Sequence, residues 1–84
     1  MTYKIVYKAS VERDLRHLDK TVARRLVRKL EEELSKNPSR GESLKGEFEG
    51  LFKYRIGDYR VIYTKTTEGI LILRIVHRKE AYRK

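Results

Sequence analysis

Three strand-type segments in the second half of the chain are separated by very short turns, and this spacing constrains the fold more than any other feature. The segments cover residues 51–56, 59–65 and 70–76, with residues 57–58 and 66–69 between them. Connections of this length join antiparallel neighbours. The last segment is apolar on both faces for most of its length, so we predict that it is a central strand.

The first half of the chain reads as one strand followed by two helices. Residues 3–7 are aromatic and β-branched, which predicts a short strand. Apolar spacing after Ser10 predicts a short helix, with the Ser10 hydroxyl as its cap. A longer amphipathic helix starts from a cap at Asp19 or Thr21 and ends before Pro38. Its apolar stripe consists of Val22, Ala23, Leu26, Val27, Leu30 and Leu34.

The whole chain, residues 1–84, is expected to form one domain, because 84 residues at 10.1 kDa suffice for a single small core. The element order is strand, helix, helix, strand, strand, strand. This order predicts an α+β fold: an antiparallel four-stranded sheet with an N-terminal helical hairpin packed on one face. The polar connection between Pro38 and Gly50 is expected to be held by Leu44 and Phe48 as buried anchors.

Several classes of site and location are excluded by what the sequence lacks. There is no cysteine, which excludes disulfides and thiolate metal sites. No zinc-ligand spacing, phosphate-binding glycine loop or nucleophile elbow occurs, so we expect neither a metal nor a cofactor. No stretch approaches the roughly 18 to 20 apolar residues of a membrane span, and no signal peptide follows Met1. We therefore expect a soluble cytoplasmic protein that makes no contact with a membrane.

The charge of the chain points to an acidic partner. Lys and Arg number 21 against 12 Asp and Glu, which gives a net charge of +9. The excess is concentrated in residues 53–84, where nine basic residues stand against three acidic ones and tyrosines lie between them. Basic and aromatic residues in this mixture bind phosphates and stack on bases. A nucleic acid or an acidic protein is the expected partner.

Period-two alternation places part of this charge on one face of the sheet. Lys53 and Arg55 alternate with the core-type residues of their strand, so they point away from the core. Arg60 is expected to join them across the hairpin, and Arg78 can reach the same face from the end of the last strand. The pattern predicts a concave cationic surface of Lys53, Arg55, Arg60 and Arg78 opposite the helices.

The hairpin and the end of the chain carry a family resemblance. The run LFKYRIGDYRVIY over residues 51–63 and the ending HRKEAYR over residues 77–83 resemble the RelE/ParE toxin superfamily, and the element order agrees along the whole chain. The resemblance implies the toxin of a type II toxin–antitoxin system. RelE-like members are ribosome-dependent, metal-independent endoribonucleases that cut mRNA in the A site, whereas ParE-like members poison DNA gyrase.

The resemblance also implies the partners. They are mRNA, the 16S rRNA of the ribosomal A site and a cognate acidic antitoxin of the RelB type. The toxin alone is expected to be a monomer, and its complex with the antitoxin a hetero-oligomer. An amphipathic helix with Asp and Glu would suit both the basic surface and the apolar grooves of the helical hairpin.

Position by position, the resemblance assigns the site. Lys53 and Arg55 match the two basic residues of the first hairpin strand, Arg60 and Arg78 match phosphate-binding arginines, and Tyr82 matches the tyrosine that stacks on the cut nucleotide. The reaction is attack of the 2′-hydroxyl on the adjacent phosphate, which needs a base, an acid and charge stabilisation. Lys53 is the expected base, provided that crowding by other cations favours its neutral form. Arg55 stays charged and is better suited to clamp phosphate.

The sequence leaves alternatives open both for the role of His77 and for the function of the whole protein. His77 is suited to general acid or base catalysis near neutral pH, and it is equally consistent with capping the strand or packing on the core. The alternatives to an mRNA endonuclease are a non-catalytic, ParE-like toxin directed at gyrase and a plain basic RNA-binding domain. Arg78 and Tyr82 favour the endonuclease.

Overall fold

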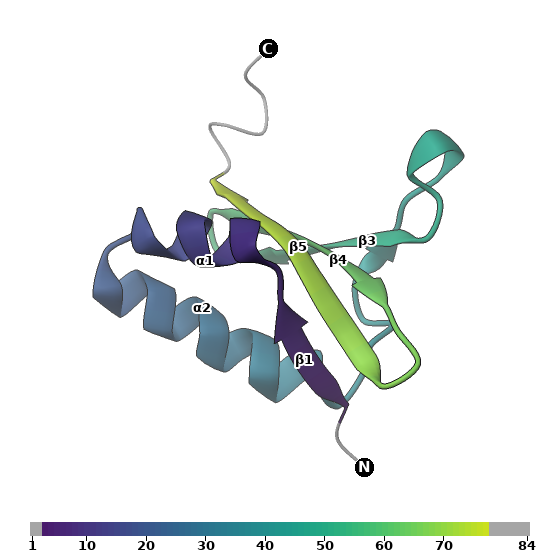
Figure 1. Ribbon diagram of the computed structural model, residues 1–84, viewed down its shortest axis with the longest axis horizontal. Helices are drawn as coiled ribbons and strands as arrows, with labels where there is room; N and C mark the ends of the chain where they lie inside the picture. Colours follow the sequence, from purple (N-terminus) through teal and green to yellow (C-terminus); the bar gives the residue numbers. More distant parts are fainter. Residues whose placement is uncertain (1–2, 78–84) are drawn as a thin grey trace.

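The strands form one layer with the two helices on one side of it, as the computed structural model shows for residues 3–77, the part of the chain that it describes (Figure 1). In chain order the elements are β1 (Lys4–Tyr7), α1 (Ala9–Arg16), α2 (Lys20–Glu33), β2 (Glu42–Ser43), the 3₁₀ helix η1 (Gly46–Phe48), β3 (Leu51–Ile56), β4 (Tyr59–Lys65) and β5 (Gly69–His77).

The sheet has the order β1-β5-β4-β3-β2. The antiparallel pairing of β3, β4 and β5 and the interior position of β5 are confirmed. Two details of the predicted sheet are wrong: β1 runs parallel to β5, and β2 adds a fifth strand beside β3. A short turn forces the two strands that it joins to run antiparallel. β1 is separated from β5 in the sequence by both helices, the long loop and three other strands, so the connection does not impose its direction.

Helix α1 takes the place of a strand along the second half of β5. Strand β1 pairs only with residues 69–72 of β5. Beyond them the Ser10 hydroxyl donates to the carbonyl of Leu73 at 2.9 Å, and a carboxylate oxygen of Asp14 accepts from the amide of Ile75 at 3.1 Å. These side chains satisfy backbone groups that would otherwise form an open edge. Ser10 was predicted to cap α1, which is wrong, because α1 begins at Ala9 without a side-chain cap.

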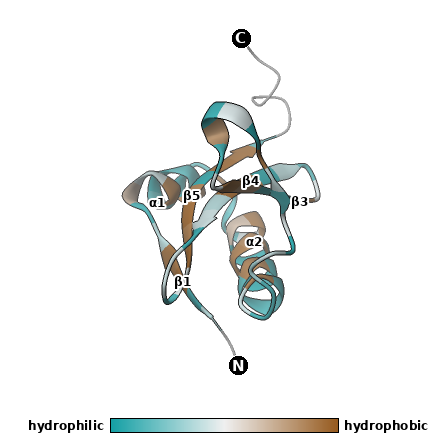
Figure 2. Ribbon diagram, turned by 90° about the vertical axis from the view of Figure 1, so that its right-hand side faces the viewer, coloured by the Kyte–Doolittle hydropathy of each residue, from teal (hydrophilic) through white to brown (hydrophobic). Residues whose placement is uncertain are grey.

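The core lies between the helices and one face of the sheet. Its buried residues are Val11, Leu26, Leu30, Leu34, Val61, Tyr63, Ile70, Ile72 and Ile75. Figure 2 shows the apolar stripe of α2 turned toward the sheet and its hydrophilic side turned outward. The four-residue spacing of its leucines produces this stripe. Phe48 was predicted to be a buried anchor and is 53% exposed, because it sits in η1 outside this core.

Candidate nucleic-acid interface

Two arginines face each other across the β3–β4 hairpin on the side of the sheet that the helices do not cover. Arg55 pairs directly with Arg60 in the register, and Lys53, two residues earlier on β3, pairs with Ile62. Partners in an antiparallel ladder share a face, so Lys53, Arg55 and Arg60 all lie on this open face. We refer to Arg55 and Arg60 together as the arginine pair.

The turn between β3 and β4 holds the arginine pair in register. Gly57 has φ 58°, a conformation that residues with a Cβ rarely adopt, and it is followed by Asp58. A small hollow of about 40 Å³ lies here, lined by the arginine pair and the turn residues Gly57, Asp58 and Tyr59. The guanidinium group of arginine is a planar fork that suits phosphate oxygens, so two arginines on one face favour the binding of phosphate.

Lys53 has an acidic neighbour that the sequence analysis did not foresee. Its ammonium nitrogen lies 3.8 Å from a carboxylate oxygen of Glu42 on β2. The Lys53 side chain is 28% exposed and that of Glu42 73%. This ion pair links β2 to β3 beside the open face, so Lys53 must release Glu42 before it can contact a ligand there.

A buried tyrosine fixes the segment that carries Glu42. The Tyr63 hydroxyl accepts from the amide of Gly41 at 2.9 Å and donates to the carbonyl of Pro38 at 2.8 Å. A Cβ on Gly41 would lie 2.6 Å from that hydroxyl, so only glycine fits here without a shift of its surroundings. Burial raises the pKa of the Tyr63 phenol, which therefore remains a donor.

Another polar cluster joins the end of α2 to β3. The Tyr54 hydroxyl donates to Oε1 of Glu33, which also lies 3.0 Å from the Arg40 guanidinium. The other oxygen of this carboxylate, Oε2, lies 2.9 Å from the Lys29 ammonium. The hydrogen bond from Tyr54, followed by that from Lys29, lowers the pKa of Glu33. Tyr54 points to the helix side of the sheet, so it supports the scaffold and does not extend the open face.

His77 lies on the other side of the sheet from the arginine pair. It pairs with Tyr59 across β4 and β5, and their rings meet edge to face with centroids 5.0 Å apart. Tyr59 packs against the core cluster, whereas the partner of Arg60 on β5 is Val76. The structure therefore does not bring His77 onto the face that carries Lys53 and the arginine pair. This geometry supports the packing alternative for His77.

The remaining predicted site residues, Arg78 and Tyr82, lie outside the described residues.

A further cation on the open face, Arg74, was missed by the sequence-based prediction. It pairs with Ile62 in the register, and its guanidinium lies 3.0 Å from the Asp14 carboxylate. The register shifts after Ile62, which leaves Leu73 as an extra residue in β5. Strict alternation from the buried Ile72 would place Arg74 in the core. An arginine at such a position is the signal in the sequence that the alternation shifts.

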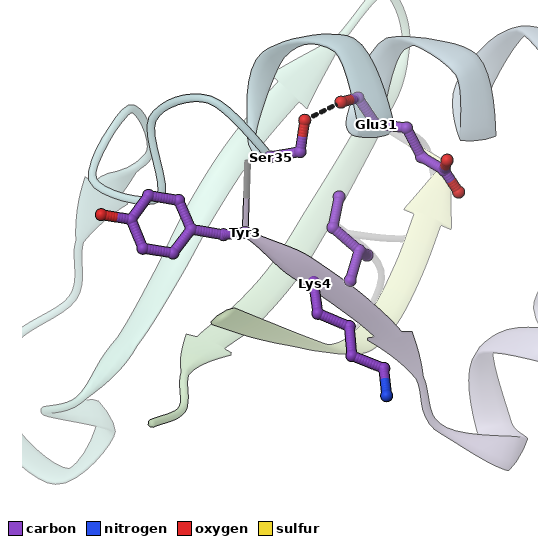
Figure 3. A pocket seen from close by; sticks show the side chains of 5 residues that line it. Tyr3, Lys4, Glu31 and Ser35 are labelled. Carbon is purple, nitrogen blue, oxygen red and sulfur yellow. Dashed lines mark hydrogen bonds between the residues drawn. The ribbon is translucent and has the colours of Figure 1, made fainter. Parts of the chain in front are cut away.

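A larger hollow of about 360 Å³ lies between β1 and the end of α2 (Figure 3). It is lined by Tyr3, Lys4, Ile5, Glu31 and Ser35. Figure 3 shows the Ser35 hydroxyl bonded to the carbonyl of Glu31. The carboxylate of Glu31 accepts from Tyr7, whose pKa is raised first by burial and then by this carboxylate. One ammonium and one carboxylate do not make a phosphate site, so the open face remains the candidate interface.

Residues 3–77 contain no group of three His, Asp or Glu side chains placed to hold a metal ion. In the same part of the chain, no helix has the length and apolar character needed to cross a membrane.

Comparison with known proteins gives a consistent result. The family described as the ParE toxin of type II toxin–antitoxin systems matches residues 5–82. Toxin RelE of Mycobacterium tuberculosis is 35% identical over 85 residues, covering 96% of this chain and 87% of the relative. A chain of the RelBE2 toxin–antitoxin complex from the same organism superposes with a TM-score of 0.85 at 32% identity, covering 93% of each chain.

A more distant match shows the fold alone. The structure of a mutant of the Escherichia coli toxin RelE in the free state has a TM-score of 0.73 at 23% identity. The match covers 98% of this chain and 88% of the other.

Proposed function

The chain belongs to the ParE toxin family of type II toxin–antitoxin systems, and from this premise we propose that it is a RelE-like toxin that cuts mRNA in the ribosomal A site. The observation that carries the proposal is the arginine pair, because two arginines that are register partners on an open sheet face suit an RNA phosphate. The proposed place of action is the cytoplasm, where ribosomes translate.

The proposed reaction is attack of the 2′-hydroxyl oxygen on the adjacent phosphorus. The bond from phosphorus to the 5′-oxygen breaks, which leaves a 2′,3′-cyclic phosphate and a 5′-hydroxyl. The arginine pair would stabilise the charge that develops on the phosphate oxygens. Lys53 is our proposed base for the 2′-hydroxyl proton, and it must leave its pairing with Glu42 to act. By resemblance we assign Arg78 to the phosphate and Tyr82 to stacking. The 5′-oxygen must also take up a proton, and His77 would have to leave its packing on Tyr59 to supply it.

A ParE-like toxin directed at gyrase is the second candidate, because the matching family carries the ParE description. One experiment separates the two. We expect the purified protein to produce discrete mRNA cuts in a reconstituted translation reaction and no DNA breaks with purified gyrase and plasmid. Gyrase-dependent breaks together with intact message would contradict our proposal and establish the second candidate.

We also propose that a cognate acidic antitoxin of the RelB type binds this chain. Support comes from the similar chain in the RelBE2 complex and from the outer surface of α2. Ala23 and Val27 line a mainly apolar hollow of about 410 Å³ together with two arginines and one carboxylate, Arg24, Arg28 and Glu31. The exposed Arg25 contributes to a neighbouring hollow of about 250 Å³. An amphipathic helix with acidic flanks is complementary to this surface. The free toxin is then a monomer and the complex a hetero-oligomer.

Antitoxin binding is expected to be tight at low ionic strength and to weaken as salt is added, because charges on the surface of α2 are screened. Isothermal titration calorimetry with the product of the adjacent gene measures both properties. The double substitution Arg24→Gln and Arg28→Gln should weaken binding about tenfold or more, whereas Arg13→Gln on α1 should not. Absence of any affinity at low ionic strength would contradict the proposal.

A further inference from the structure

The six residues 45–50 form a projection that we call the finger. It connects β2 to β3 and extends away from the helices beyond the sheet (Figure 1). Its base is closed by the amide of Leu44, which donates to the carbonyl of Leu51 at 2.9 Å, and by the hydroxyl of Thr64, which donates to the carbonyl of Gly50 at 2.9 Å. All six residues of the finger are exposed.

The conformation of the finger is built into its own backbone. The amide of Phe48 donates to the carbonyl of Lys45 at 3.4 Å, and that of Glu49 donates to the carbonyl of Gly46 at 3.1 Å. Gly46 and Gly50 have φ of 72° and 95°, and a Cβ at either position would meet no atom within 4 Å. Glycine is needed there for the backbone and not for packing. The finger is therefore preorganised, which reduces the entropy lost when it binds a partner.

The finger presents one aromatic side chain between acidic ones. Phe48 is 53% exposed and stands between Glu47 and Glu49 in the sequence. A ring that is presented on a preformed projection can anchor an interface when it enters an apolar pocket. Phe48 belongs neither to the core cluster nor to the residues packed against it. A partner could therefore bury the Phe48 ring without disturbing the packing of the fold.

The charges at the tip of the finger select the partner. Lys45 at the base of the finger is basic, but the two residues beside Phe48 are carboxylates. These carboxylates repel RNA phosphates and an acidic antitoxin alike, and they attract a basic protein surface. The arginine pair lies at the other end of β3 from the finger: Leu51 and Arg55 are roughly 13 Å apart along the strand. Contact with an RNA strand and contact with a neighbouring protein can therefore take place together.

We propose that the finger docks Phe48 into an apolar pocket on a basic protein surface of the ribosome, with Glu47 and Glu49 facing cations at the rim of that pocket. The proposal rests on the proposed function, since it places the toxin on the ribosome, and it assigns to the finger a protein contact separate from the RNA contact of the open face.

The test measures ribosome binding and mRNA cleavage separately. Phe48→Ala should weaken binding of labelled toxin to ribosomes about tenfold or more, measured by co-sedimentation, and Glu47→Gln with Glu49→Gln should weaken it less. Tyr3→Ala removes an aromatic side chain that is 45% exposed and far from the finger, and Glu12→Gln removes an exposed carboxylate on α1. Neither control should change the affinity. Thermal unfolding should be unchanged in every finger variant, and Phe48→Ala should leave the affinity for naked RNA unchanged.

A photocrosslinking residue at position 48 then identifies the class of partner. Adducts with ribosomal protein support the proposal, whereas adducts only with rRNA overturn it. If wild type and Phe48→Ala bind ribosomes equally well and both cut mRNA there, the finger contact is overturned and the proposed function stands. Binding that depends on Phe48 but is not followed by cleavage supports the finger contact and contradicts the nuclease. Absence of ribosome binding by the wild type contradicts both.

Discussion

Arg60→Ala is expected to lower cleavage of ribosome-bound mRNA by about 10²–10³-fold while the protein stays folded. Arg60 pairs with Arg55 in the register on the open side of the sheet and is not part of the core cluster. In our mechanism it contacts a phosphate oxygen whose charge increases in the transition state, so its loss should lower the rate of the chemical step. The change in unfolding free energy should stay within about 0.5 kcal/mol, as for most surface substitutions. Single-turnover cleavage at saturating toxin measures the effect.

Matched variants separate charge, geometry and folding. Arg55→Ala should act like Arg60→Ala, and Arg55→Lys should restore only part of the rate, because an ammonium lacks the planar fork. Arg13→Ala removes an exposed arginine from α1 and should leave cleavage unchanged. Leu30→Ala should destabilise by roughly 2–5 kcal/mol, so its loss of activity would be accompanied by a lower melting temperature. Full activity of both Arg55→Ala and Arg60→Ala would refute the phosphate role of the arginine pair.

The β3–β4 hairpin was predictable because its determinants are local. The two-residue turn at Gly57 and the alternation along both strands specify which residues are partners, and Arg55 and Arg60 follow directly from them. The direction of β1 was not predictable in this way, since its partner lies at the other end of the chain. Strand β2 has no strand-type composition, and its pairing with β3 depends on the loop that Tyr63 holds in place.

The end of β5 shows why alternation alone misplaces residues. The extra residue Leu73 reverses the phase of the strand, so that Arg74 faces the open side and Ile75 is buried. The same reversal places His77 beside Tyr59. No local composition specifies such a bulge, because it depends on how β5 fits both β4 and α1. Phe48 was misplaced for a different reason: an aromatic residue in a loop favours burial only if a core lies within its reach.

The largest expected effect is that of the ribosome itself. We expect mRNA in the A site to be cut at least about 10⁴-fold faster than the same sequence as naked RNA, at saturating toxin in both cases. Correct positioning of reacting groups can contribute roughly 7–11 kcal/mol in favourable intramolecular reactions. Flexible single-stranded RNA seldom holds its 2′-hydroxyl in line with the leaving oxygen. On the open face of this sheet, the hollow that the arginine pair lines has a volume of only about 40 Å³.

We therefore expect the protein to bind naked RNA without cutting it efficiently. The arginine pair and the net charge of +9 predict binding that weakens steeply with salt through phosphate contacts, while the bound RNA is cut very slowly. Tyr82→Ala should reduce single-turnover cleavage on the ribosome and leave the affinity for naked RNA nearly unchanged, because stacking orients one nucleotide and adds little to long-range attraction. Rapid cutting of naked RNA by both wild type and Tyr82→Ala would instead mean that the protein aligns its substrate without the ribosome. The acid and the base would then have to come from the chain alone, and His77 could join Lys53 in this role only by leaving its packing on Tyr59.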